Sequence, residues 1–492
     1  MFNTIRDVKS APDLIYKIFI NVIYTFIVSL FILGFFSYHG EKLIYIVFSI
    51  VSNTLVYLGF RKKAIFFDLI IAVFFWLGFW LKFTVRVVFA EGRFYEAVGD
   101  FNYTGAAYDQ ALLVASVGMA GFLMASLVRG RYIFNYPCKY KEKIESQQGI
   151  ITFYNNHRTF ILVSFLFLIL LISISNNYLG IYQRGAITKT VLPLGLNLIY
   201  KWLLLFGLSS FSAVIIKCEL IEKRNLYWVL ILSLFETFAS NVSLLSRGMI
   251  INTSALAYGL YRYCKVHFIK IKPNFLAIYI LLFMMLFLSS VYIVKYLRPL
   301  AAPVATESVS IKAFVADLKS TKMEGTTALF FDRWVGIEPV MAVTSSSIKG
   351  WGLFREALQE KFSENKMGFY DKKLITSPYI ATDFNLYHHV SLPGIIAFFY
   401  YPDSVIFLFF SMFLASLLAS LIEQLTYIFC GRNLILCSLM AEVVAFRFAH
   451  FGYAPGQTYL LFSAIIFNIL LICSVNKMLI FWYKLKSNYL GC

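Results

Sequence analysis

Charged residues are scarce in this chain, and the sequence patterns of soluble enzymes are missing. Only 14% of its 492 residues are charged, whereas 60% are hydrophobic and the mean hydropathy is +0.72. This composition excludes an ordinary soluble globular protein. The chain also lacks a Walker A sequence, a strand-borne GxGxxG, HExxH and paired CxxC. We therefore expect no ATP-driven machine, no metal and no cofactor.

Long apolar runs recur along nearly the whole chain. A membrane-spanning helix needs about 20 apolar residues to cross about 30 Å of hydrocarbon. We predict an all-α fold: a polytopic membrane helix bundle of about 12 transmembrane helices. The runs lie near residues 15–37, 43–60, 64–89, 109–128, 159–176, 192–216, 226–245, 248–264, 275–297, 404–424, 433–449 and 457–476.

One long polar interval divides the chain into three parts. Residues 1–297 hold the first nine predicted transmembrane helices, and residues 298–391 are predicted to form one large outer loop. Residues 392–492 return to the membrane and hold the last three helices. The loop has none of the chain's 7 cysteines, so it must hold its shape by packing and not by disulfides.

The large loop carries the spacing of amphipathic helices. Apolar residues recur at helical intervals over 308–319 and 351–362, and a more apolar helix over 327–345 is predicted to kink at Pro339. The sequence thus predicts a short helical cap over the outer face of the bundle.

The net charge of +18, from 44 Lys and Arg against 26 Asp and Glu, indicates membrane orientation. Most basic residues lie between the apolar runs, as in Arg61-Lys62-Lys63 and residues 129–158. The positive-inside rule assigns these segments to the cytoplasm, and an even number of spans then places both termini there. We expect the lipid bilayer, and no nucleic acid, as a partner.

A smaller set of basic residues lies at the predicted outer ends of the helices, against that rule. Arg247 lies in the tight turn SLLSRGMII and Arg333 in the loop segment FFDRWVGIE. We expect these two to bind an anionic group at the outer leaflet, because Arg binds phosphate bidentately. For Arg184 and Lys295 we favour an interfacial anchor, while Arg447 fits either role equally. The same outer set includes Arg298, and Glu338 and His450 are near Arg333 and Arg447 in the sequence.

Two adjacent histidines lie where the large loop returns to the membrane. His388 and His389 occur in TDFNLYHHVSLPGIIAFFYYP and are two of only 6 histidines. Neutral imidazole is well matched to accepting a proton near neutral pH. The alternative is a pair of interfacial histidines bonded to loop backbone, but the neighbouring outer cations favour a catalytic role for one of them.

These patterns together resemble the bacterial O-antigen polymerase family, the Wzy-type oligosaccharide repeat-unit polymerases, with the O-antigen ligases as more distant relatives. The resemblance rests on SLLSRGMIINTSALAYGLYRY, on FFDRWVGIEPVMAV and on His388-His389 followed by LPGIIAFFYY. The sequence HHVS departs from the His-Asn pair that is common in ligases.

The resemblance implies a GT-C-like fold and an inverting, metal-independent glycosyltransferase. Such an enzyme polymerises undecaprenyl-pyrophosphate-linked oligosaccharide repeat units into O-antigen or a related surface polysaccharide, at the periplasmic face of the bacterial inner membrane. A flippase and a chain-length regulator of the same pathway are the implied partners. In this interpretation Arg247, Arg333 and Arg298 hold the pyrophosphate, and His388 or His389 takes the acceptor proton.

Two other functions remain open. An O-antigen ligase would share the topology and transfer the polymer to lipid A-core. A lipid-linked oligosaccharide flippase or other transporter, which is not an enzyme, would need charges deep in many spans and would not need a loop of this size.

Overall fold

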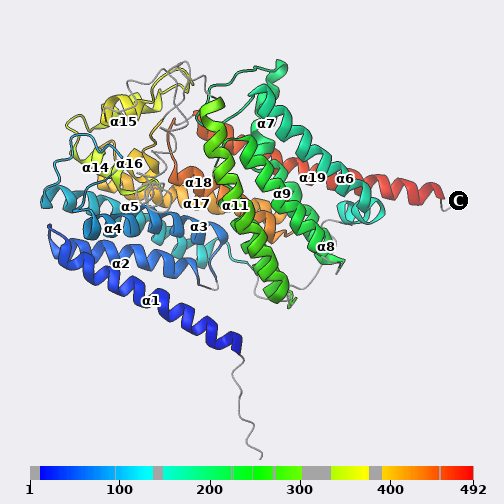
Figure 1. The fold of residues 1–492 in the computed structure, drawn as a ribbon, viewed down its shortest axis with the longest axis horizontal. Coiled ribbons are helices and arrows are strands. Elements are labelled where there is room, and N and C mark those ends of the chain that lie inside the picture. Colours follow the sequence, from blue (N-terminus) through cyan, green and yellow to red (C-terminus); the bar gives the residue numbers. More distant parts are fainter. Residues whose placement is uncertain are drawn as a thin grey trace, which may run out of the picture.

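The computed structural model describes residues 11–61, 63–94, 96–136, 148–222, 224, 226–246, 248–269, 273–301, 334–375, 390–453 and 456–490. Within these ranges it leaves out the side chains of residues 11–20, 148, 249, 273, 298–301 and 486–490. The described residues form helices and connecting loops and contain no β-strand (Figure 1).

Each predicted apolar run coincides with a helix or with helices joined end to end. In the first part of the chain these are α1 (Ala11–Ser37), α2 (Lys42–Gly59), α3 (Phe66–Phe75), η1 (Trp76–Leu81), α4 (Lys82–Phe89), α5 (Gly105–Tyr132), α6 (Gln148–Leu179), η3 (Pro193–Gly195), α7 (Leu196–Trp202), η4 (Leu203–Gly207), α8 (Leu208–Ile221), α9 (Tyr227–Ser243), α10 (Met249–Val266) and α11 (Pro273–Ala301). The loop and the last part hold α14 (Ile337–Ser345), α15 (Trp351–Leu358), η6 (Asp371–Ile375), α16 (Gly394–Phe399), α17 (Val405–Phe429), α18 (Leu434–Ala449) and α19 (Gly456–Leu490).

Eight helical stretches of the described chain are long and apolar enough to cross a membrane. One of them joins α3, η1 and α4 into a single span, Phe66–Phe89, and another runs from Pro193 to Ile221. Helix α9, with 17 residues, and α18, with 16, fall short of that length. The polytopic helical membrane protein is therefore confirmed, while the number of about 12 spans stays a prediction.

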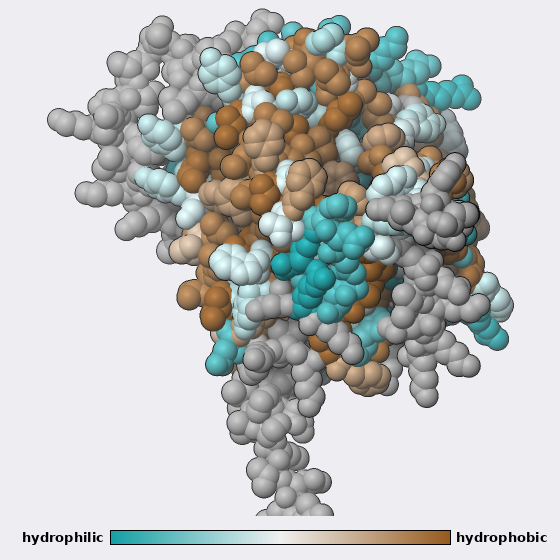
Figure 2. Space-filling view, turned by 90° about the vertical axis from the view of Figure 1, so that its right-hand side faces the viewer, coloured by the Kyte–Doolittle hydropathy of each residue, from teal (hydrophilic) through white to brown (hydrophobic). Residues whose placement is uncertain are grey.

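The outward surface of the bundle is apolar, as contact with lipid requires. Leu281 and Leu288 on α11 are 72% and 61% exposed. Figure 2 shows a broad hydrophobic surface on one face, with hydrophilic side chains gathered in one compact patch and at the edges. In water so large an apolar surface would drive association, and in a bilayer the acyl chains cover it.

Helix α18 runs through the middle of the bundle, where neighbouring helices shield it. It packs against α3, α8, α10 and α17, and its residues Ile435, Leu436 and Met440 are fully buried. Asn433 caps its first turn, because its Oδ1 accepts hydrogen bonds from the N–H groups of Ile435 and Leu436 at 3.1 and 3.2 Å. Helix α18 is thus interior to the fold.

The described loop helices gather at one end of the long helices (Figure 1). Helix α14 is buried in the bundle and does not cap it: Ile337, Val340 and Met341 are fully buried. Pro339 is its third residue, in the first turn, where a missing N–H costs no hydrogen bond, so the predicted kink is absent from this helix.

The other two helices predicted in the loop have different outcomes. The helix predicted over 351–362 is present but shorter, as α15. The helix predicted over 308–319 lies outside the described residues.

Candidate functional site

A cavity of about 180 Å³ lies at one end of the bundle, between the long helices and the described loop. Carboxyl, imidazole and aromatic side chains meet in its wall. The lining residues are Lys82, Glu96, Ala97, Trp334, Val335, Glu338, Pro339, Tyr370, Val390, Ser391, Leu392 and His450. They come from α4, the segment between α4 and α5, α14, the large loop and the end of α18. The cavity therefore forms only when these segments, which are far apart in sequence, pack together.

Close backbone contact places α14 beside this cavity. A Cβ on Gly336 would lie 1.8 Å from the carbonyl oxygen of Gly78, and a Cβ on Gly78 would lie 2.4 Å from that of Val335. The chain therefore crosses η1 at a point where only two glycines fit. This crossing carries Glu338, two residues later, to Lys82 in the α4 part of the α3–α4 span.

A buried ion pair joins the two elements at the cavity wall. Lys82 Nζ lies 2.5 Å from Glu338 Oε1, and the two side chains are only 1% and 3% exposed. The same ammonium donates a hydrogen bond to the carbonyl oxygen of Trp334 at 2.8 Å. Each charge needs the other here, because a lone charge at this depth would be strongly destabilising.

Aromatic rings order the rest of the wall. Trp334 stacks on Phe74 with ring centroids 5.7 Å apart. His450 stacks on Phe446 at 4.1 Å, and its Nδ1 lies 3.1 Å from the Phe446 carbonyl oxygen. These contacts hold one indole and one imidazole at the cavity, and both present polar atoms on rigid rings.

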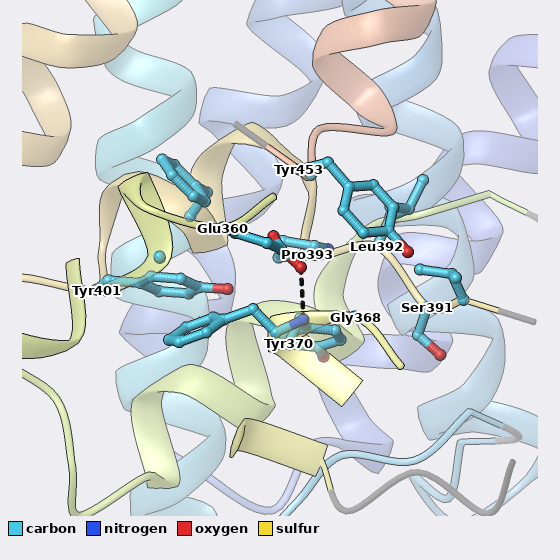
Figure 3. Close-up of a pocket in the computed structure, with 13 residues that line it drawn as sticks. Glu360, Gly368, Tyr370, Ser391, Leu392, Pro393, Tyr401 and Tyr453 are labelled. Carbon is cyan, nitrogen blue, oxygen red and sulfur yellow. Dashed lines mark hydrogen bonds between the residues drawn. The ribbon is translucent and has the colours of Figure 1, made fainter. Parts of the chain in front are cut away.

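A second, smaller hollow adjoins the cavity and shares Tyr370, Val390, Ser391 and Leu392 with it. Its volume is about 10 Å³, enough for about one water molecule. Figure 3 shows Glu360 in its middle, between Tyr401 and Tyr453, accepting a hydrogen bond of 2.6 Å from the Phe369 N–H. Burial raises the pKa of Glu360, and backbone hydrogen bonds partly oppose that rise.

Asp371 links the described segment that ends at residue 375 to the one that begins at residue 390. Its carboxylate accepts the Ser391 N–H, with distances of 3.2 and 3.1 Å to its two oxygens. Asp371 is 1% exposed. Residues 371 and 391 are thus held together at the point where the chain returns to the membrane.

The predicted residues closest to this cavity in sequence lie outside the described part of the chain. They are His388, His389 and Arg333. Arg247, in the turn between α9 and α10, is also outside the described residues. Their assignments stay predictions. The cavity wall nevertheless includes Trp334, which directly follows Arg333, and Val390, which directly follows His389.

Arg184 contacts the turn that contains Arg247. Its backbone N–H donates to the Leu244 carbonyl oxygen at 2.9 Å, and its Nη1 lies 3.3 Å from Ser246 Oγ. Its guanidinium also lies 5.5 Å from the centroid of the Phe446 ring, whose neighbour is His450. Arg184 is therefore more than the interfacial anchor that its sequence position suggests, since it joins this turn to the end of α18.

Arg447 has a different set of contacts. Its Nη2 donates to the Gly452 carbonyl oxygen and to Thr458 Oγ1, the latter at 3.1 Å, and its guanidinium lies 5.4 Å from the Phe451 ring centroid. These contacts close the turn between α18 and α19. Arg447 is absent from the cavity wall, although His450, on the next turn of chain, lines it.

The other secondary candidates divide between the cavity and the lipid surface. Glu338 lines the cavity, as the ion pair requires. Lys295 is exposed on α11, and its role as an interfacial anchor stays a prediction. Arg298 lies on the same helix, but its side chain is not described.

Sequence reasoning missed Lys82 and Glu96. Lys82 lies inside the apolar run 64–89. An ionisable residue within a span is a functional candidate by default, so the signal was present. Glu96 has no comparable signal, because it lies in an ordinary polar loop and only the fold brings it to the cavity.

The described wall offers carboxylates, the Lys82 ammonium paired with one of them, the His450 imidazole and aromatic rings. No group of three or more His, Cys, Asp or Glu side chains within the described ranges is arranged to hold a metal ion. Comparison of the chain with protein-family models, with curated proteins and with solved structures gave no match.

Proposed function

We propose that the protein is a membrane glycosyltransferase that polymerises lipid-pyrophosphate-linked oligosaccharide repeat units, as the family resemblance implies. The observation that carries this proposal is the cavity at the outer end of the bundle, where Glu96, Glu338, Trp334 and His450 converge. Carboxylates accept hydrogen bonds from sugar hydroxyls, and flat rings cover the apolar faces of sugars. The volume of about 180 Å³ suits about one sugar residue and not a whole repeat unit.

The reaction requires two further functions from the protein. The acceptor hydroxyl oxygen bonds to the anomeric carbon, the bond from that carbon to the lipid pyrophosphate breaks, and the hydroxyl proton passes to a base. The leaving pyrophosphate keeps the bonding electrons, so fixed cations must stabilise its growing charge. We assign this role to Arg247 and Arg333, aided by Arg298, and the role of base to His388 or His389.

The position of the described wall supports these assignments. Trp334 and Val390 connect the cavity directly to Arg333 and His389 along the chain. His450 is a further candidate base, because its ring is part of the wall itself. In the GT-C-like interpretation, sugar, pyrophosphate and base would thus meet at the outer membrane surface.

The buried charges favour an enzyme over a flippase. A translocator needs polar groups free to face a passing headgroup. Here Asp68 is bound by Arg129 at 2.5 Å, and Glu423 accepts the N–H groups of Phe66 and Phe67, each at 2.9 Å. These groups hold helices together.

The decisive experiment uses full-length protein in detergent with lipid-linked repeat units extracted from cells that lack it. We expect a ladder of longer lipid-linked glycans. Arg247→Ala and Arg333→Ala should each slow ladder formation by about 10²–10³-fold, the loss seen when one preorganised transition-state donor is removed. Arg355→Ala, at an exposed position on α15, is the matched control and should keep the wild-type rate.

The same preparation separates the alternatives. Transfer of finished polymer to added lipid A-core, without a ladder, would indicate the ligase. Movement of lipid-linked units across a vesicle bilayer without any new glycosidic bond would indicate the flippase. Unchanged rates in both arginine variants would overturn the assigned pyrophosphate site.

A further inference from the structure

A basic hollow of about 430 Å³ lies at the opposite end of the bundle from the cavity. It is formed where α2 and α5 end, and its wall consists of Arg61, Lys63, Leu127, Gly130 and Arg131. Helix α5 has 28 residues and is about 40 Å long, so its two ends lie on opposite sides of a bilayer. The hollow therefore lies at the membrane surface that the positive-inside rule assigns to the cytoplasm.

The positive charge around the hollow is only partly balanced by the protein. Arg61 lies 3.7 Å from Asp68, but Asp68 is already bound by Arg129 at 2.5 Å. Lys63 and Arg131 form no ion pair with any residue that the structure describes. An anion entering the hollow would thus meet cations whose charge is not already neutralised.

Arg61 is held in place from behind. Its Nη2 donates to the Ser126 carbonyl oxygen at 2.6 Å and lies 2.9 Å from Ser126 Oγ. Its buried Nε has no hydrogen-bond partner among the described groups. A Cβ on Gly130 would lie 3.2 Å from Nη2, so glycine keeps the space beside the guanidinium open. The cation is thus positioned in advance at the wall of the hollow.

The hollow opens onto an apolar surface. Leu127 is 47% exposed, and Met124, one turn earlier on the same face of α5, is 48% exposed. On α2, Tyr57 lies one turn before Arg61 and is 77% exposed. A ligand here therefore meets cations at one end and an apolar, lipid-facing wall at the other. This arrangement matches the charged headgroup and the apolar chains of an anionic phospholipid.

We propose that this hollow binds the headgroup phosphate of an anionic phospholipid, with Arg61, Lys63 and Arg131 at the phosphate and the acyl chains along Leu127 and Met124. Arg and Lys bind phosphate oxygens by charge-assisted hydrogen bonds, and basic hollows between helices on this side of a membrane suit anionic headgroups. The inference stands apart from the proposed enzymatic function.

The test is native mass spectrometry of the full-length protein in detergent, titrated with phosphatidylglycerol. The variant K63Q/R131Q removes two exposed cations and leaves the Arg61 contacts intact. Each basic group near an anionic headgroup contributes enough for about a fivefold change, so we expect binding about 30-fold weaker than wild type. The control K265Q/K477Q removes two exposed cations from α10 and α19, neither of which lines the hollow, and should bind as wild type does.

Two further titrations identify the source of the phosphate. Phosphatidylcholine should bind much more weakly than phosphatidylglycerol, and inorganic phosphate at the lipid's concentration should not displace it. Equal affinity of the two double variants would overturn the proposal. So would equal binding of phosphatidylcholine, or displacement by equimolar inorganic phosphate, since neither fits an anionic phospholipid site.

Discussion

The ion pair between Lys82 and Glu338 links one residue of a predicted membrane span to one residue of the large loop. Both side chains are almost fully buried, and the ammonium also bonds the Trp334 backbone. Removing one partner leaves the other charge buried without compensation, which costs more than the intact pair contributes. The ion pair therefore holds α14 against α4 at the cavity wall.

A single substitution at this pair should lower the free energy of unfolding more than the double substitution does. We expect Lys82→Met to lower the free energy of unfolding by about 3–5 kcal/mol, because Glu338 is left buried and unpaired. The double variant K82M/E338Q should recover most of that loss. Thermal unfolding in detergent measures both, and a double variant as unstable as Lys82→Met alone would contradict the pairing.

Glu360 predicts a dependence of stability on pH. Burial raises its folded-state pKa above the ordinary value of 4.5, so the folded protein binds this proton more tightly than the unfolded chain does. The resulting stability is complete below the unfolded pKa and is lost as the pH rises through the folded pKa.

Wild type should therefore lose stability relative to Glu360→Gln as the pH rises above about 4.5, because only the wild-type protein has this buried carboxyl group to deprotonate. The melting temperature of wild type minus that of the variant should fall as the pH rises in this range. Glu356→Gln is the matched control, because Glu356 is exposed in the same loop and pairs with Lys373 at 3.0 Å. A difference that stays constant with pH would show that Glu360 does not titrate there.

At the scale of elements, the crossing of the loop over η1 decides whether the cavity forms. Gly78 and Gly336 approach so closely that neither position has room for a Cβ. Gly336→Ala should therefore push α14 outward, lower stability by about 1–3 kcal/mol and reduce glycan ladder formation.

Gly352→Ala provides the comparison for that variant. A Cβ at Gly352 meets nothing within 4 Å, and alanine favours the helix α15 in which it lies. This variant should be as stable as wild type or slightly more so. If both alanine variants unfold alike, the glycine crossing is not what holds α14.

The helix boundaries could be predicted from the local sequence, whereas the burial of each helix could not. The apolar run predicted at 433–449 is α18, and the cap at Asn433 explains its start. Its central position could not be predicted, because a helix surrounded by protein and a helix facing lipid are both apolar all round. The same ambiguity made the buried α14 resemble a surface cap in sequence.

At the scale of the whole molecule, the predicted topology places the cavity outside and the basic hollow inside. Lys361→Cys, near the cavity, should react with a membrane-impermeant maleimide once the outer membrane is permeabilised. Lys63→Cys, at the hollow, should react only after the inner membrane is opened as well. Both positions are exposed, so access to the reagent is set by membrane side alone.

The reverse labelling order would show that the bundle has the opposite orientation. The cavity would then face the cytoplasm, which contradicts glycosyl transfer at the outer face. The unsubstituted protein is the necessary control, because the chain already has 7 cysteines, and among those described Cys473 is partly exposed. Labelling of both cysteines from outside would likewise contradict the predicted orientation.

What the sequence determined by itself was the class of the protein and the course of its helices. Apolar length and basic segments are local properties, and a bilayer acts on them span by span. Only the tertiary structure decided that Lys82 pairs with Glu338, that Glu96 and His450 share a wall with Trp334, and that Arg184 supports the turn around Arg247. These residues are far apart in the chain, and their proximity depends on how α14 and α18 pack inside the bundle, which no periodicity in one segment encodes.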